Sequence, residues 1–353
     1  MGQYFRLIAP HRRERLSWWG KLGEILFDGS GSALVYHFAR PVIPSTFTGD
    51  EPRNIPAAVR GSVVPQKRRR QSSHSQKLPR HEVARSRLHE LPVEINRIIF
   101  DFLDITDVFI LGLTCEKFWA IAKSIIGQRF AACLGGWAGT AVICVGDESD
   151  CGRNVAYPEG LLLPEDFDEL QEGLDLDELE DGVPDKYAGQ PVNLYSIADA
   201  RYDIVGNCDV YFPQDLLHVA LEHRHKHPRP ADILEVAHPR GSTFYPASHE
   251  WVLRNLTTRE FVRPMAVALN KRRTRGPFID TPGYGEVILS RTCWSTEDNT
   301  SMARKGMHQG VWAGHALDIV PSTYLDSGGP WKDISDDVAK NTAEIWKSEY
   351  GED

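Results

Sequence analysis

The chain has 353 residues, which is more than one ordinary hydrophobic core accommodates, so we expect two domains or one domain with an insertion. Hydrophobic residues make up 41% of the chain and charged residues 25%, a balance that excludes a natively disordered protein. The formal net charge of −9 disfavours non-specific binding to nucleic acid, and no apolar run is long enough to predict a membrane-spanning helix.

The first 45 residues predict an ordered segment that begins a β-rich domain. The stretches "QYFRLI" and "RERLSWW" indicate short strands around a polar turn at Ala9–Arg12, and "WWGKLGEILF" then favours a helix. The N-terminus has no apolar core of a signal peptide. The six cysteines form no CxxC pair, so we expect reduced thiols in an intracellular protein.

Residues 46–87 predict a flexible basic linker, because proline, serine, glutamine and basic residues replace the large apolar side chains. Within it, Lys67–Arg70 could form a nuclear import signal. A solvated basic loop is the simpler interpretation of so short a cluster. We therefore expect a cytoplasmic protein, a nuclear protein, or both.

Residues 88–126 predict three short amphipathic helices. The first opens at Leu91-Pro92, since proline is tolerated in the first turn of a helix. Its apolar stripe follows helical spacing, while Phe100 lies off that stripe and gives the helix a second apolar side. The stripe consists of Ile95, Ile98, Ile99, Phe102 and Leu103. The predicted polar side of the helix consists of Glu94, Asn96, Arg97 and Asp101. So small a bundle cannot stabilise itself, so it needs a host domain or a partner.

The same segment resembles an F-box. The matching residues are Leu91, Pro92, Glu94, Ile95, Ile98, Ile99, Leu103, Asp107, Leu111, Leu113, Thr114, Cys115, Phe118 and Trp119. The resemblance implies binding to the Skp adaptor of a cullin–RING ubiquitin ligase, through an apolar helix face and without catalytic residues. It also implies that the rest of the chain holds a protein substrate, which the sequence does not identify. We expect these residues to face the adaptor: Leu91, Pro92, Ile95, Ile98, Ile99, Leu103 and Leu111.

Residues 127–353 predict the remainder of the β-rich domain. "GGWAGTAVICVGD" indicates a buried strand, an acidic loop covers residues 165–185, and short strands and turns follow. The last segment places Val338, Thr342, Ile345 and Trp346 on one face of a docked terminal helix. The predicted class is α+β: a small three-helix module inserted into a duplicated antiparallel scaffold, with a C-terminal helix.

An internal repeat supports the duplication. Residues 4–16 align with 250–262, and residues 137–147 align with 312–322, in the same order. About 71 more residues separate the two segments in the first copy, which residues 46–126 account for as an insertion. We expect Trp18, Trp19, Trp137, Trp251 and Trp312 to anchor a core, with an aromatic ligand cage as the alternative. The outer part also resembles a group of fungal proteins that begin Met-Gly-Gln-Tyr and for which no activity is established.

Motifs for catalysis are weak. Asp28–Phe38 lacks the complete pattern of a phosphate loop, Asp280–Gly285 indicates a turn, and neither HExxH nor GxSxG occurs. The histidines at 218, 223, 225, 227 and 238 could hold a metal, but their surroundings favour a solvent loop. We expect no cofactor and no catalytic, cofactor or metal residues. The alternatives to an F-box adaptor are a scaffold protein that buries these helices as core and, more distantly, an enzyme acting on a small molecule.

Overall fold

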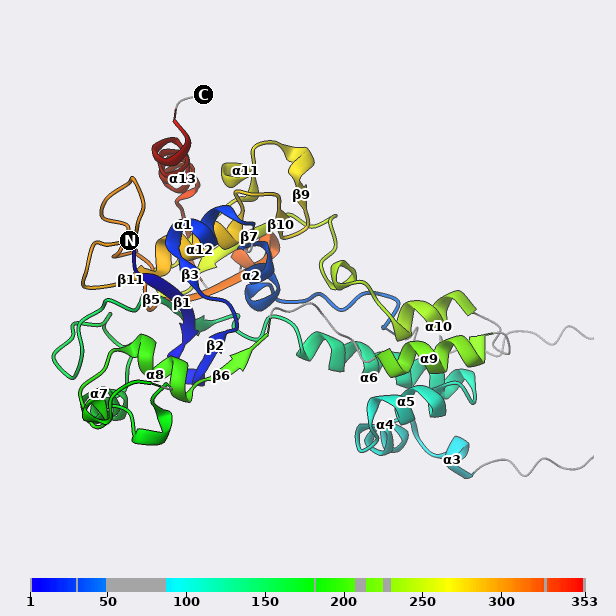
Figure 1. Ribbon diagram of the computed structural model, residues 1–353. Coiled ribbons are helices and arrows are strands. Elements are labelled where there is room, and N and C mark those ends of the chain that lie inside the picture. Colours follow the sequence, from blue (N-terminus) through cyan, green and yellow to red (C-terminus); the bar gives the residue numbers. More distant parts are fainter. Residues whose placement is uncertain are drawn as a thin grey trace, which may run out of the picture. The chain divides into compact units, whose positions relative to one another are not determined.

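The computed structural model describes residues 2–29, 31–48, 87–180, 182–206, 214–224, 230–326 and 329–351, and these form two compact units. The scaffold unit comprises Met1–Val42, Phe130–Tyr211 and Arg240–Asp353. The helical unit comprises Ile43–Arg129 and Phe212–Pro239. The described elements confirm the predicted α+β class (Figure 1). None of the described helices is long and apolar enough to cross a membrane.

The first sheet of the scaffold unit has the strand order β11-β5-β1-β2-β6, with β3 paired to β1. Its central strand, β1, is buried along residues 5–9 because strands flank it on both sides. The strands are β1 (Tyr4–Ala9), β2 (Glu14–Leu16), β3 (Gly20–Lys21), β5 (Ile143–Gly146), β6 (Asp203–Val205) and β11 (Cys293–Trp294).

The second sheet has the order β13-β8-β7-β12-β4, and a separate small hairpin pairs β9 with β10. All five residues of β7, the central strand of the second sheet, are buried. The strands are β4 (Thr140–Ala141), β7 (Trp251–Asn255), β8 (Glu260–Val262), β12 (Ala316–Pro321), β13 (Lys332–Asp333), β9 (Thr274–Arg275) and β10 (Phe278–Ile279).

Both sheets are mixed, whereas the sequence predicted antiparallel pairing. The hairpins β1–β2 and β7–β8 are antiparallel, as a short turn requires. The pairs β2–β6, β8–β13 and β5–β11 are parallel. Each of these parallel pairs joins strands far apart in the chain, where no tight turn fixes the strand direction.

The repeated segments occupy equivalent positions in the two sheets. Phe5 lies opposite Gly146 in the first sheet, and Trp251 lies opposite Pro321 in the second, at the positions that the sequence alignment equates. The hairpin turns also correspond, because their central arginines share the left-handed conformation. The φ angle is 51° at Arg13 and 56° at Arg259.

The equivalent helices α2 (Gly31–Phe38) and α12 (Tyr284–Thr292) pack against each other. They approach so closely that a Cβ atom on Gly285 would lie 1.7 Å from the carbonyl oxygen of Gly31. Glycine at 285 is therefore required by space at this crossing. Most of the segment that was considered as a phosphate loop therefore forms helix α2, one member of this helix pair.

Each of these helices is followed by a Trp-Ala-Gly turn that folds back on it. In the first half, Trp137 N donates to His37 O at 2.9 Å. In the second half, Trp312 N donates to Arg291 O at 2.7 Å. His37 and Arg291 are therefore structurally equivalent residues of the two copies.

The two turns also bond across to the opposite half. Gly139 N donates to Leu317 O at 2.8 Å, and Gly314 N donates to Val142 O at 2.9 Å. The alignment equates Gly139 with Gly314 and Val142 with Leu317. The two hydrogen bonds are therefore equivalent, one running from the first half to the second and the other from the second half to the first. The scaffold unit therefore has approximate two-fold symmetry at this point.

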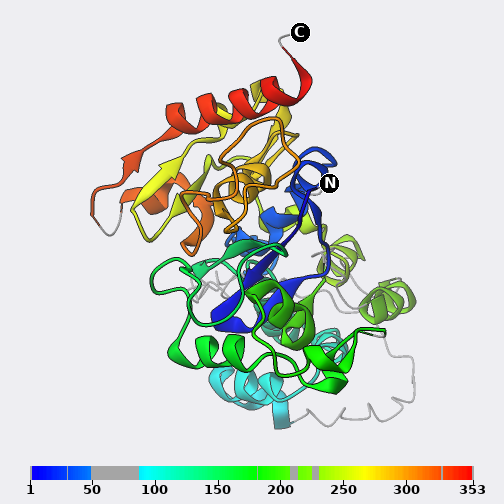
Figure 2. The same cartoon turned by 60° about the vertical axis from the view of Figure 1, so that its left-hand side comes forward.

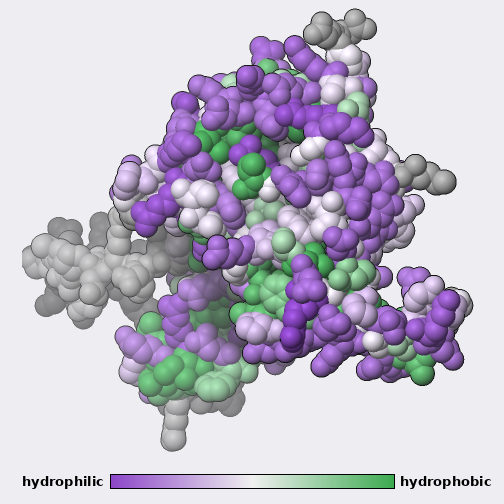
Figure 3. All heavy atoms as spheres, turned by 90° about the vertical axis from the view of Figure 1, so that its left-hand side faces the viewer, coloured by the Kyte–Doolittle hydropathy of each residue, from purple (hydrophilic) through white to green (hydrophobic). Residues whose placement is uncertain are grey.

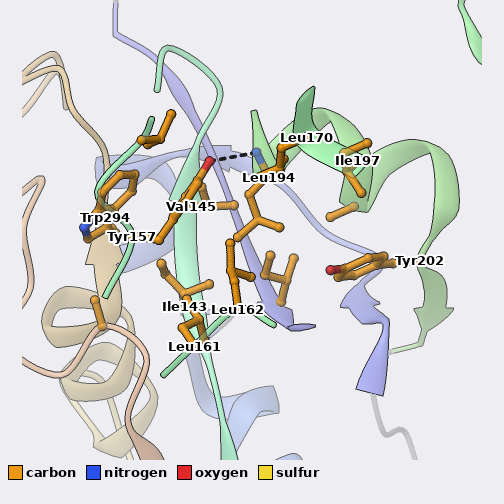
Figure 4. Close-up of a cluster of buried hydrophobic side chains, with 14 of the residues drawn as sticks. Ile143, Val145, Tyr157, Leu161, Leu162, Leu170, Leu194, Ile197, Tyr202 and Trp294 are labelled. Atoms are coloured by element: carbon orange, nitrogen blue, oxygen red, sulfur yellow. Dashed lines mark hydrogen bonds between the residues drawn. The ribbon is translucent and has the colours of Figure 1, made fainter. Parts of the chain in front are cut away.

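A large apolar cluster covers one face of the first sheet (Figure 4). Tyr157 lies within it, with its ring 4.6 Å from that of Trp294 and its hydroxyl accepting from Leu194 N at 2.9 Å. Leu170 from α7 (Pro164–Glu172) and Ile197 from α8 (Leu194–Arg201) close the cluster. The predicted acidic loop therefore begins as a helix that buries Leu170.

The terminal helix α13 (Ser335–Tyr350) docks on the scaffold unit as predicted, against α11 and β8 (Figure 2). Val338, Thr342 and Ile345 are buried. Trp346 packs edge-on against Phe27, with ring centroids 4.8 Å apart. The other helices of the unit are α1 (Leu22–Phe27) and α11 (Pro264–Val267).

Three of the five predicted tryptophan anchors are fully buried: Trp137, Trp251 and Trp312. Trp18 is only half-buried, and the prediction for Trp19 is wrong, since 53% of its surface is exposed. Trp19 lies between β2 and β3 and packs edge-on against exposed Tyr4, with ring centroids 4.9 Å apart. A position in a loop at the sheet edge gives it no core to enter.

The helical unit contains α3 (Arg87–Glu90), α4 (Val93–Asp101), α5 (Ile105–Gly112), most of α6 (Glu116–Ala132), α9 (Gln214–His223) and α10 (Pro230–Ala237). Helices α9 and α10 pack on each other, and α9 packs on α5 (Figure 1). Both helices were expected in the β-rich domain, within residues 127–353. The linker was expected to begin at residue 46, but Phe47 is fully buried and touches Gly127. Lys67–Arg70 lie outside the described residues.

Candidate partner-binding face of the helical unit

The inward side of the helical unit is an aromatic core. Phe100 packs edge-on against Phe118, and Phe109 against Trp119, with ring centroids 5.6 Å apart in both pairs. The indole nitrogen of Trp119 donates to Asp232 Oδ2 at 2.8 Å, which ties α6 to α10. Two helices distant in sequence therefore complete the core that the three predicted helices lack.

Asn96 corrects the predicted polar side of α4, because it is fully buried. Its amide nitrogen donates to Leu91 O at 3.2 Å, and Lys117 Nζ donates to the same oxygen at 2.6 Å. Lys117 also donates to His89 O at 2.9 Å. These bonds hold the Leu-Pro corner at the start of α4, where Pro92 is the N-cap residue.

The outward side of α4 is apolar and exposed. The exposed fraction is 43% for Ile95, 52% for Ile98 and 87% for Phe102, residues spaced three and four apart. Because this spacing follows the helical repeat, the three side chains share one face. Val93 at the start of the helix and Ile110 on α5 are also exposed.

The seven predicted adaptor-facing residues divide into two groups, and none is fully buried. Pro92, Ile95 and Ile98 are exposed. The half-buried residues are Leu91, Ile99, Leu103 and Leu111. We call the outward residues Pro92, Ile95, Ile98 and Phe102 the α4 face. Phe102 is not among the predicted adaptor-facing residues, although it belongs to the predicted stripe.

Carboxylates surround this face on the same helices. Asp104 caps α5 by accepting from Asp107 N at 2.8 Å. That backbone hydrogen bond is the main cause that lowers the pKa of Asp104. The other exposed carboxylates of α3 to α6 are Glu90, Glu94, Asp101, Asp107 and Glu116.

Other exposed apolar side chains are scattered over the surface. On the face of the molecule in Figure 3, hydrophobic residues form separate areas between hydrophilic ones. In the scaffold unit, Leu163, Leu176, Leu269 and Val311 are exposed, but they lie far apart in sequence on different elements. Single exposed apolar residues are ordinary, whereas several on one helix face indicate a binding surface.

No metal centre is formed by the described residues, where no three His, Cys, Asp or Glu side chains gather in a suitable arrangement. His218, His223 and His238 belong to these residues, and His225 and His227 lie outside them. The predicted turn Asp280–Gly285 leads into α12, where Glu286 Oε2 accepts from Gly283 N at 2.7 Å. That segment therefore caps a helix.

Comparison of the chain with protein-family models, with curated proteins and with solved structures gives no match. The functional argument therefore depends on the α4 face and on the chemistry of the chain's own residues.

Proposed function

We propose that the chain is a substrate receptor of a Skp–cullin–F-box ubiquitin ligase and that the α4 face binds the Skp-type adaptor. The observation that carries this proposal is the contrast between two phenylalanines of one helix region. Phe100 is fully buried in the unit's own core, while Phe102 is 87% exposed. An almost fully exposed phenylalanine next to other exposed apolar residues is typical of a binding surface.

The α4 face has the composition of a protein-binding surface. Its centre is aliphatic and aromatic, and charged residues lie on the same helices around it. Burying one large apolar side chain contributes about 1.5–3 kcal/mol, which offsets part of the cost of association. The inward bonds of Asn96 and Lys117 hold the helix in place before binding, which reduces the entropy cost of association.

The internal-scaffold alternative needs these residues to be covered by the chain itself. Within the described residues, Ile95, Ile98 and Phe102 are not covered. The enzyme alternative gains no support from the α4 face, which holds no titratable pair aimed at a pocket. Substrate binding then falls to the scaffold unit, and the adaptor links the chain to a cullin.

The test measures binding of a purified Skp-type adaptor to the intact chain by titration calorimetry. We expect Ile98→Asp and Phe102→Asp each to weaken binding by about thirtyfold or more, the effect of losing a hot spot worth about 2 kcal/mol. Leu221→Asp is the matched control, because Leu221 is an exposed leucine of the same unit on α9. It should bind like the unchanged chain.

Circular dichroism of each variant checks that the fold is retained. Failure of the folded, unchanged chain to bind the adaptor would overturn the proposal. Equal loss of affinity in Leu221→Asp would show that the effect is general and not specific to the α4 face.

A further inference from the structure

A cationic cavity of about 220 Å³ lies in the second half of the scaffold unit. Its walls come from the end of α12, from the segment 304–311 and from α13. Three cations, Arg291, Arg304 and Lys305, line it together with the polar side chain of Asn341. The sequence motifs gave no reason to expect these residues to meet.

Arg291 is the unusual member of this group. Its guanidinium stacks on the ring of Trp312, 4.4 Å from the ring centroid. Its Nε is buried and has no hydrogen-bond partner among the described residues. Burial lowers the pKa of Arg291, although an arginine keeps its charge in a protein. A buried N–H donor without a hydrogen-bond partner is costly unless a ligand supplies an acceptor.

The nearby carboxylates are placed unequally with respect to the three cations. Glu344 accepts from Arg304 Nη1 at 2.9 Å, so one cation is already paired. Asp298 accepts from Gly306 N at 3.3 Å and makes no ion pair with the three cations. Glu260 and Asp337 act on Arg291 only through longer-range attraction. Arg291 and Lys305 therefore remain available to an anion.

The first half of the scaffold unit provides an internal comparison. The equivalent of Arg291 is His37, whose ring lies 5.4 Å from that of Trp137. Burial lowers the pKa of His37 to about 4, so this side chain is neutral at physiological pH. In the first half, a neutral imidazole ring packs against Trp137, the equivalent of Trp312. Packing alone therefore does not require a charged side chain at position 291.

From these observations we infer that the Arg291 cavity binds a single phosphoryl group. Arginine and lysine side chains that line one small cavity are the usual recognition elements for phosphate oxygens. Pockets for drug-sized ligands are typically about 300–1,000 Å³, so this smaller space suits one phosphoryl group. The inference does not rest on the proposed adaptor binding.

The experiment measures thermal stabilisation and calorimetric binding of the full chain with inorganic phosphate and with O-phospho-L-serine. Sodium chloride at matched ionic strength and glutarate serve as controls for charge alone. The decisive variant is Arg291→His, because it installs the side chain that the first half carries at this position. Lys271→Ala removes an exposed cation outside the cavity and serves as the matched control.

We expect both phosphoryl probes to bind the unchanged chain and Lys271→Ala, and Arg291→His to weaken binding about tenfold or more. Tighter binding of O-phospho-L-serine would identify a phosphorylated side chain as the source, and tighter binding of phosphate would identify the free ion. Equal stabilisation by sodium chloride or glutarate, or unchanged binding in Arg291→His, would overturn the inference and leave an adventitious ion only. Adaptor binding should be the same in Arg291→His, so this result is separable from the proposed function.

Discussion

At the scale of single residues, hydropathy alone does not tell which side chains of the α4 region are buried and which are exposed. Phe100 and Phe102 are the same residue type two positions apart, yet one is buried and the other exposed. The polar Asn96 is buried with its amide nitrogen bonded to Leu91 O, while its Oδ1 has no hydrogen-bond partner among the described residues. A buried amide with a backbone partner costs less than its polarity suggests.

This contrast predicts opposite effects of two neighbouring substitutions. Phe100→Ala should lower the free energy of unfolding of the helical unit by about 3–5 kcal/mol, because it leaves a cavity beside Phe118. Phe102→Ala should change it by less than about 0.5 kcal/mol, since an exposed side chain loses little. Urea unfolding followed by circular dichroism measures both. Similar losses in the two variants would show that Phe102 also belongs to the core.

His37 makes the stability of the scaffold unit depend on pH. Burial lowers its pKa to about 4, opposed in part by attraction to Glu14, whereas the unfolded value is near 6.5. The unfolded state therefore binds more protons between these values, and the stabilisation present above pH 6.5 is lost as the pH falls towards 4. The loss attributable to His37 should be at most about 3 kcal/mol.

The measurement compares denaturant unfolding of the unchanged chain and of His37→Gln at pH 7 and at pH 4.5. The difference in stability between the two chains should depend on pH. A constant difference would mean that His37 titrates normally in the folded state.

At the scale of helices and strands, the least expected feature is the packing of α9 and α10 within the helical unit. Nothing local in their sequences indicates which unit they join, because an amphipathic helix specifies a face and not a partner. The bond between Trp119 and Asp232 is the most specific contact that holds α10 to α6. Lys123 Nζ also lies 3.6 Å from the same carboxylate.

Asp232→Ala should lower the stability of the helical unit by about 1–3 kcal/mol, because it leaves the buried indole N–H without an acceptor. Asp232→Asn keeps an acceptor oxygen and should lose clearly less. A double-mutant cycle with Trp119→Phe isolates the interaction. A coupling energy near zero would contradict the assigned role of this bond.

Periodicity and repetition predicted the α+β class and the terminal helix, and the repeated segments do occupy equivalent positions in the two sheets. The alignment worked because hairpin residues such as Phe5 and Trp251 have local partners fixed by their turns. The parallel pairs, the burial of Asn96 and the Arg291 cavity depend on contacts between distant segments. Such contacts leave no periodic signal in the sequence, so they could not be predicted from it.

At the scale of the whole molecule, the two halves of the scaffold unit carry different additions at equivalent points. In the first half, the segment between α2 and Trp137 contains most of the helical unit. In the second half, the segment between α12 and Trp312 carries Arg304 and Lys305 of the cationic cavity. The two proposed binding functions therefore arise from additions to one repeated framework.

The two compact units should unfold as separate cooperative bodies in scanning calorimetry. Phe100→Ala should lower the melting temperature of one transition, that of the helical unit. Tyr284→Phe should lower the other, because the buried hydroxyl of Tyr284 donates to Trp251 O and Val262 O, at 2.8 and 3.2 Å. A single transition shifted by both variants would contradict two independent units.

The reciprocal bonds from Gly139 to Leu317 and from Gly314 to Val142 have the form of an isologous interface, in which each partner contributes the same patch. Two separate identical subunits could meet in this way, but every loop added to one would then be added to both. A fused chain is released from that constraint. It can lengthen one loop into a helical arm and line the other with arginine and lysine, and so combine in one molecule two features that a symmetric dimer would have to duplicate.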